Sequence, residues 1–313
     1  MSLMFTLAKW MIRLSGNKKT TALPLDALCA RLQGFNRSRS FSLPRDGRFR
    51  YREEKITLDT DAGTRETFPC LVMEQKEAAR PEQRRAILYV YGGGMLMAPL
   101  PLFLRFAKKM GERTGADIWF PYYPLCDRFT MRDAVRMIAA AYERMTGLYG
   151  DIRWYGFSSG GVLIYLLGAY LNDLRKQGGP SLPQAKRLVL VSPGGVPVDD
   201  EERRLMAKKD ATDMMLSCRY MDTIRPLLTH GRTDIPAYML TGEGADLTGF
   251  PETWIYYSTD EVLSVKAPAF LKALKRYGVP CHLRLAPGMP HCYCATRCAE
   301  TQADYDEIIR ILS

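Results

Sequence analysis

A serine between two glycines is the first group in this sequence that is suited to covalent chemistry. Ser158 lies in the segment YGFSSGG, residues 155–161, with Gly156 and Gly160 on either side of it. The residues before this segment predict a buried strand and those after it a long apolar helix. Glycines without a Cβ let the strand and the helix approach closely, so that the turn presents the Ser158 hydroxyl. The alternative interpretation is a Gly/Ser-rich turn without chemistry.

A serine hydroxyl becomes a good nucleophile only when a base takes its proton. The sequence contains three histidines, His230, His282 and His291. His282 falls inside a predicted strand, and His230 falls in a charged segment that interrupts the alternation of strands and helices. His291 follows a predicted strand in a Pro/Gly loop, and the carboxyl ends of parallel strands share one edge of a sheet. His291 is therefore the predicted base.

A third group must orient the imidazole and stabilise its cation. Asp260 directly follows the strand predicted at 253–259 and is the predicted partner of His291. The adjacent Glu261 is interpreted as the opening residue of a helix, where a carboxylate interacts favourably with the helix dipole. Asp246 precedes a strand, which places it at the opposite edge. The chain order serine, acid, histidine is the order found in α/β-hydrolases.

A triple glycine after the strand predicted at 86–91 supplies the remaining part of such a site. We expect the backbone N–H groups of Gly93, Gly94 and Ser159 to form an oxyanion hole. The neighbouring side chains are expected to line a substrate pocket, and these are Tyr91, Met95, Met97 and Tyr122.

Strand and helix patterns alternate along most of the chain. The predicted strands are 55–60, 68–74, 86–91, 116–121, 151–157, 186–193, 253–259 and 281–287. The predicted helices are 101–114, 131–145, 162–176, 262–277 and 299–312. This alternation predicts an α/β fold with a mostly parallel sheet flanked by helices. Residues 51–198 and 231–313 form the predicted catalytic domain, and residues 1–50 and 199–230 the predicted helical cap.

Four motifs together resemble the hormone-sensitive-lipase-like branch of the α/β-hydrolase superfamily: YGGG at 91–94, GFSSGG at 156–161, STDEVL at 258–263 and GMPHCY at 288–293. The resemblance covers roughly residues 85–312. It implies the α/β-hydrolase fold, a helical cap and hydrolysis of small or short-acyl carboxylic esters through an acyl-enzyme, without a cofactor. Tyr91 stands where this branch usually has histidine, and Phe157 and Ser159 replace its usual Asp and Ala.

Two other functions are compatible with these motifs. The first is an amidase or peptidase that uses the same three residues. The second is a non-catalytic relative that binds a small molecule, as in a plant hormone receptor of this branch that has lost its histidine. Retention of His291 argues against the second interpretation.

Composition limits the partners and cofactors that we expect. The 313 residues include 44 Lys and Arg against 34 Asp and Glu, a net charge of +10, but no nucleic-acid recognition motif accompanies the charge. Eight cysteines without a CxxC pair favour free thiols and a cytoplasmic location. Cys292, Cys294 and Cys298 cluster near His291, yet their spacing is not that of a zinc site. We therefore expect no nucleic acid and no metal.

The first residues predict an amphipathic helix. Met4, Leu7, Met11 and Leu14 recur at helical spacing, and Lys9 and Arg13 interrupt the apolar run. No segment reaches the ~18–20 apolar residues that a membrane span needs. We expect the helix to pack on the protein itself, with contact to a membrane surface as the alternative. The sequence leaves the oligomeric state open.

Overall fold

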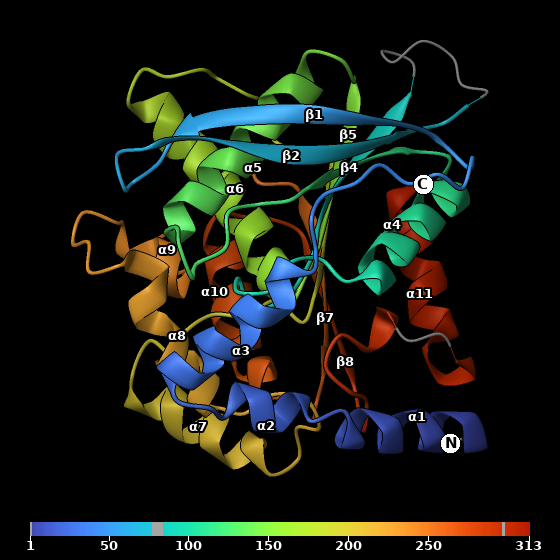
Figure 1. Cartoon of the computed structure of the whole chain (residues 1–313), viewed down its shortest axis with the longest axis vertical. Coiled ribbons are helices and arrows are strands. Elements are labelled where there is room, and N and C mark those ends of the chain that lie inside the picture. Colours follow the sequence, from blue (N-terminus) through green and yellow to red (C-terminus); the bar gives the residue numbers. More distant parts are fainter. Residues whose placement is uncertain (1, 77–83, 296–297) are drawn as a thin grey trace.

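A computed structural model describes residues 2–76, 84–295 and 298–313 of the chain (Figure 1). Eight strands form one sheet in the order β1-β2-β4-β3-β5-β6-β7-β8. Their bounds are β1 (Arg50–Asp59), β2 (Arg65–Glu74), β3 (Arg85–Val90), β4 (Asp117–Pro121), β5 (Asp151–Phe157), β6 (Arg187–Val191), β7 (Glu252–Ser258) and β8 (Cys281–Ala286). Each strand overlaps one that the hydrophobic pattern predicts.

The strands from β4 to β8 in this order are parallel, whereas β1 and β2 extend the sheet by antiparallel pairing. Val90 pairs with Gly156, so the loops after β3 and β5 leave the sheet side by side. Ser258 pairs with Ala286, which does the same for the loops after β7 and β8. The register thus brings four segments together at the carboxyl edge of the parallel strands. They are the glycine loop (92–94) after β3, the turn with Ser158 after β5, the segment with Asp260 and Glu261 after β7 and the loop with His291 after β8.

Helices cover both faces of the sheet. α4 (Pro101–Thr114) and α11 (Ala299–Leu312) lie on one face, and α5 (Met131–Thr146), α6 (Ser159–Lys176) and α10 (Ala267–Arg276) lie on the other (Figure 1). α6 begins three residues earlier than predicted, directly after Ser158. The helix predicted at 262–277 is divided into a 3-10 turn, η2 (Val262–Lys266), and α10.

The remaining helices lie in the N-terminal segment and in or just after the insertion at 199–230. They are α1 (Leu3–Leu14), α2 (Asn17–Thr21), α3 (Leu25–Arg37), α7 (Asp200–Asp210), α8 (Arg219–Thr229) and α9 (Ala237–Thr241). The backbone N–H of Ser217 donates to Oγ1 of Thr21 at 2.9 Å, and Nζ of Lys18 donates to the carbonyl of Asp213 at 2.9 Å. The two segments therefore meet in space, and their assignment to a separate cap stays a prediction.

One apolar face of α1 is exposed, whereas the sequence predicted that it would pack on the protein. Phe5 is buried, but Leu7, Met11 and Leu14 are exposed, although their spacing was expected to bury them against the protein. The side chain of Met4, the fourth residue of that pattern, lies outside what the structure describes. In the described part of the chain, none of the helices is both long enough and apolar enough to cross a membrane.

Candidate active site

The turn after β5 holds Ser158 in a strained conformation. Its φ of 53° and ψ of −128° lie where residues with a side chain are rarely found, and α6 begins at the next residue. A Cβ on Gly156 would lie 2.5 Å from the carbonyl oxygen of Gly160, and a Cβ on Gly160 would lie 2.2 Å from that of Val90. Both glycines are needed for the close approach of strand, turn and helix, and the strain at Ser158 is typical of a functional site.

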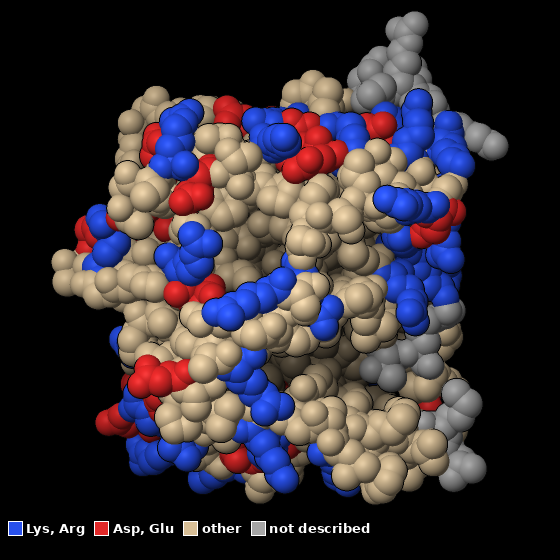
Figure 2. All heavy atoms as spheres, viewed as in Figure 1, with Lys and Arg blue, Asp and Glu red and all other residues tan. Residues whose placement is uncertain are grey.

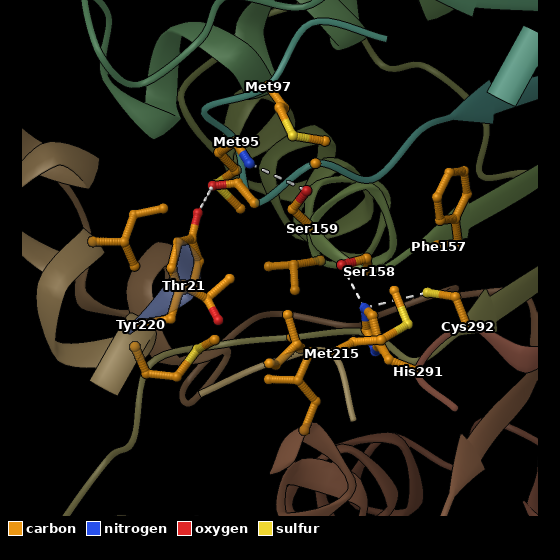
Figure 3. A pocket seen from close by; sticks show the side chains of 18 of the residues that line it. Thr21, Met95, Met97, Phe157, Ser158, Ser159, Met215, Tyr220, His291 and Cys292 are labelled. Atoms are coloured by element: carbon orange, nitrogen blue, oxygen red, sulfur yellow. Dashed lines mark hydrogen bonds between the residues drawn. The ribbon is translucent and has the colours of Figure 1, made fainter. Parts of the chain in front are cut away.

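His291 contacts Ser158 directly (Figure 3). Nε2 of His291 lies 2.9 Å from Oγ of Ser158, and Nδ1 lies 2.5 Å from Oε2 of Glu261. Both His291 and Glu261 are buried. The three side chains form a hydrogen-bonded chain from a carboxylate through an imidazole to a hydroxyl, with the serine at its end. This is the arrangement in which an imidazole can take the proton of a serine nucleophile.

The prediction that Asp260 is the partner of His291 is wrong. Oδ1 of Asp260 accepts a hydrogen bond from Oγ1 of Thr259 at 2.9 Å, whereas Glu261 occupies the position against His291. β7 ends at Ser258, and a short turn places Asp260 partly in solvent and Glu261 inside, before η2. The backbone N–H of Ser258 donates to Oε1 of Glu261 at 2.7 Å.

A serine hydroxyl also donates a hydrogen bond to the Glu261 carboxylate. Oγ of Ser192, which follows β6, donates to Oε1 of Glu261 at 2.9 Å. Burial raises the pKa of Glu261, although its hydrogen bonds and the nearby imidazole oppose that rise. Burial acts to lower the pKa of His291, but the neighbouring Cys292 and Glu261 hold it well above its ordinary value. The buried carboxylate thus stabilises the protonated imidazole.

Three backbone N–H groups lie beside Ser158, two in the glycine loop and one at the first residue of α6. Gly93 and Gly94 have φ values of 142° and 63°, which turn their N–H groups out of the strand direction. Within the described part of the chain, the N–H groups of Gly93, Gly94 and Ser159 donate no hydrogen bond. Oγ of Ser159 accepts a hydrogen bond from the N–H of Met95 at 3.2 Å, which ties the loop to the first turn of α6 (Figure 3).

A residue from α8 also holds this loop. The hydroxyl of Tyr220 donates to the carbonyl of Gly94 at 2.6 Å (Figure 3). A Cβ on Gly94 would lie 2.0 Å from that hydroxyl, so the loop and the tyrosine are closely fitted. Tyr220 could not be identified from the sequence, because it lies 126 residues from Gly94 in a segment that only the fold brings over the site.

Ser158 and His291 open into a mostly apolar cavity of about 350 Å³. The surface is hollowed beside α2 and α3 in Figure 2. Met95 and Met97 line the cavity, as expected from the sequence. Further apolar lining comes from α3, α6, α8 and the segment before α8, namely Leu28, Leu32, Val162, Met215, Leu216, Met221, Ile224 and Leu228.

Tyr91 and Tyr122 do not line this cavity, contrary to the prediction. The ring of Tyr91 is buried between Tyr123, with centroids 4.4 Å apart, and Phe120, at 5.3 Å. The ring of Tyr122 packs edge-on against Phe41 at 5.1 Å. Both rings are therefore held by neighbouring aromatic side chains and point away from the cavity. The hydroxyl of Tyr123 donates to the Tyr91 carbonyl at 3.0 Å, and this bond holds the residue that directly precedes the glycine loop.

The other two histidines lie elsewhere. Nε2 of His230, at the end of α8, lies 2.9 Å from the carbonyl oxygen of Cys126. The ring of His282 stacks on Trp254 with centroids 4.9 Å apart, and its Nε2 lies 2.9 Å from Oε1 of Glu252. Neither histidine contacts Ser158 or Glu261.

All eight cysteines are free thiols. Cys294 is buried, whereas Cys292 lines the cavity with its Sγ 3.3 Å from Nε2 of His291. Among the described residues, no group of histidines, cysteines and acids has the arrangement of a metal site. Cys292 is thus the one cysteine of the cluster at 292–298 for which the described structure records contact with His291.

Comparison with known proteins places this architecture in a family. Residues 87–295 match the family model described as "alpha/beta hydrolase fold", which is more than half of the chain. The chain therefore belongs to the α/β-hydrolase fold family, and the predicted fold class is confirmed. A search of curated protein sequences found no significant match.

Solved structures show the same fold over the whole chain. One is an esterase from the bacterial hormone-sensitive lipase family, with 21% identity and a TM-score of 0.74 over 100% of this chain and 98% of that one. Another is EstE5, with 20% identity, a TM-score of 0.74 and coverage of 100% and 97%. A third is an esterase/lipase from an uncultured bacterium, with 19% identity, a TM-score of 0.73 and coverage of 100% and 97%. At these identities the likeness shows a shared fold.

Proposed function

We propose that the protein is a serine-dependent carboxylic ester hydrolase. The observation that carries this proposal is the hydrogen-bonded chain Glu261–His291–Ser158, which ends at the wall of an apolar cavity. The names of the similar structures support it, since they describe esterases and a member of the hormone-sensitive lipase family. The proposed catalytic acid is Glu261, in place of Asp260.

In the proposed reaction, Oγ of Ser158 attacks the ester carbonyl while Nε2 of His291 takes its proton. The negative oxygen of the tetrahedral intermediate accepts hydrogen bonds from the N–H groups of Gly93, Gly94 and Ser159, and each such donor is worth about 3–4 kcal/mol. His291 then protonates the leaving alcohol. Water, deprotonated by the same imidazole, hydrolyses the acyl-enzyme and restores Ser158.

The cavity indicates the kind of substrate. Its lining is mostly apolar, and no Lys, Arg, Asp or Glu is among the lining residues. An uncharged ester with an apolar acyl group is therefore favoured over a charged one, because a charge would lose its hydration there without a partner. One neighbour, EstE5, was soaked with p-nitrophenyl butyrate. We propose esters of short acyl chains as substrates, in keeping with a volume of about 350 Å³.

Hydrolysis of p-nitrophenyl esters from acetate to long acyl chains tests the proposal. We expect kcat/KM to be highest at short chains and to fall once the acyl group exceeds the cavity. The matching p-nitroanilides should be hydrolysed far more slowly. Absence of turnover by the folded protein on every ester would overturn the proposal, and faster cleavage of the anilides would make the protein an amidase.

The pH dependence of kcat/KM provides a prediction about His291. Only the neutral imidazole can accept the serine proton, and the pKa of His291 is raised well above its ordinary value of 6.5. Activity should therefore be lost as the pH falls through this raised pKa, with the midpoint of the acid limb above pH 6.5. The Glu261→Gln variant should shift this limb to lower pH, since the carboxylate no longer stabilises the cation. An unshifted midpoint in this variant would contradict the assignment.

Tyr220→Phe tests the link between α8 and the oxyanion loop. The variant removes the hydrogen bond to the Gly94 carbonyl and leaves the ring in place. We expect kcat to fall about 10-fold, equivalent to about 1.4 kcal/mol, while KM changes less than about twofold because ground-state binding is preserved. The matched control is Tyr238→Phe, which also loses one hydrogen bond, to Asp173 at 2.6 Å, but lies outside the cavity. A larger effect on KM than on kcat would refute the positioning role.

A further inference from the structure

The N-terminal helix α1 exposes an apolar face. Leu7, Trp10, Met11 and Leu14 are exposed to 55%, 61%, 56% and 62%. They follow the spacing i, i+3, i+4 and i+7, so they share one face of the helix. In Figure 2 the region at lower right, where Figure 1 places α1, carries few charged side chains. A cluster of large apolar side chains of this kind marks an interaction surface.

The opposite face holds α1 to the protein. Phe5 is buried, Oγ of Ser2 donates to Oε2 of Glu300 at 3.1 Å, and Nζ of Lys9 donates to the carbonyl of Gly288 at 2.9 Å. Gly288 lies three residues before His291, and α2, which follows α1, contributes Thr20 and Thr21 to the cavity lining. The exposed face therefore belongs to a fixed helix beside the proposed active site.

The charges that α1 and α2 themselves carry are of one sign. The first 25 residues contain Lys9, Arg13, Lys18 and Lys19 but no Asp or Glu. Arg13 and Lys19 are exposed. An apolar face with tryptophan, bordered by cations, is the pattern of a helix that lies in the interface of an anionic membrane. A positive net charge of +10 adds to the attraction.

A second copy of the chain fits this face less well. Four partly exposed side chains on one helix fall short of the ~800 Å² per partner that a stable protein interface buries. Two basic helices placed against each other would also bring like charges together. A bilayer has neither restriction, because it covers a small apolar face without a complementary shape and supplies the negative charge.

We propose that α1 binds the surface of an anionic phospholipid bilayer, with Leu7, Trp10, Met11 and Leu14 inserted among the lipid chains. Arg13 and Lys19 contact the headgroups. The attachment of α1 beside the histidine loop and the cavity then brings the site to the membrane surface. This placement suits esters that partition into lipid, a consequence that depends on the proposed hydrolase function, whereas the binding itself does not.

Co-sedimentation with vesicles tests the proposal without any assay of catalysis. The wild-type protein should bind vesicles of phosphatidylcholine with phosphatidylglycerol and bind pure phosphatidylcholine more weakly. The variant Leu7→Gln/Met11→Gln/Leu14→Gln should lose binding by about 1,000-fold, since each of the three apolar side chains contributes about tenfold to partitioning. Arg13→Gln/Lys19→Gln should lose the preference for the anionic lipid, and salt at about 1 M should have the same effect.

The control variant is Leu148→Gln/Leu205→Gln/Leu285→Gln, whose leucines are exposed to 40%, 42% and 44% outside α1. It should bind vesicles as the wild type does. Both triple variants should hydrolyse a soluble short ester at the wild-type rate. Three results would overturn the proposal: no binding of the wild type to anionic vesicles, equal binding by the α1 variant, or a wild-type dimer that the α1 variant dissociates in sedimentation experiments. Because binding is measured directly, its failure would leave the hydrolase proposal standing.

Discussion

Replacing Ser158 with alanine should abolish ester hydrolysis. The change removes the hydroxyl that lies 2.9 Å from Nε2 of His291, and we expect kcat to fall about 10⁴–10⁶-fold, with KM almost unchanged. The measurement is p-nitrophenyl ester hydrolysis with active-site titration. An alkyl phosphonate probe should add its mass to the wild type and not to the variant, which separates loss of the nucleophile from loss of folding.

The adjacent serine provides a matched control. Ser159→Ala keeps the backbone N–H in the proposed oxyanion hole and removes only the hydroxyl that accepts from Met95. We expect a loss of about 10-fold or less, in proportion to one hydrogen bond. Equal losses from Ser158→Ala and Ser159→Ala, or phosphonate labelling that persists without Ser158, would contradict the assignment of the nucleophile.

Glu261→Gln should have the second largest effect. A glutamine amide that donates to Nδ1 of His291 would hold the proton on Nε2, where the imidazole can no longer accept from Ser158. We therefore expect kcat to fall about 10³–10⁴-fold. The buried carboxylate is also lost as a partner of the imidazole cation, so the deficit should be largest above the pKa of His291 and should narrow at lower pH, where the wild type itself loses the neutral imidazole.

Asp260→Asn is the control that decides between the two neighbouring acids. Its carboxylate is partly exposed and bonds to Thr259, so the variant should keep kcat within about twofold of the wild type. If Asp260→Asn were inactive and Glu261→Gln active, Asp260 would be the functional acid and the assignment of Glu261 would be overturned. Thermal unfolding of both variants checks that the comparison is made on folded protein.

Much of the architecture could be predicted from sequence because it depends on repeated patterns. Buried apolar runs such as 86–91 and 151–157 identify parallel strands, and the shared carboxyl edge then places Ser158 and His291 together. The structure brings these two residues to 2.9 Å. The glycines that flank Ser158 could also be interpreted physically, since a Cβ at Gly156 or Gly160 would meet the backbone.

The choice between Asp260 and Glu261 could not be made in this way. The two acids are adjacent, and only the turn after Ser258 decides which of them points inward. The contact of Tyr220 with the glycine loop could not be predicted for a related reason. Hydrophobic periodicity does not show which helix of an inserted segment lies over a distant loop. Tyr91 was misplaced because the ring stacking of the core determines its direction.

The bond between Tyr220 and the Gly94 carbonyl also limits how the cavity can open. α8 lines the cavity and at the same time holds the loop that carries two of the three proposed oxyanion donors. A movement of α8 large enough to break this bond would release Gly94. The open form, which admits the substrate, would then lack an ordered Gly94 and would not catalyse the reaction. Closure of α8 over the substrate would restore the loop, so that substrate entry and catalysis would take place in different states.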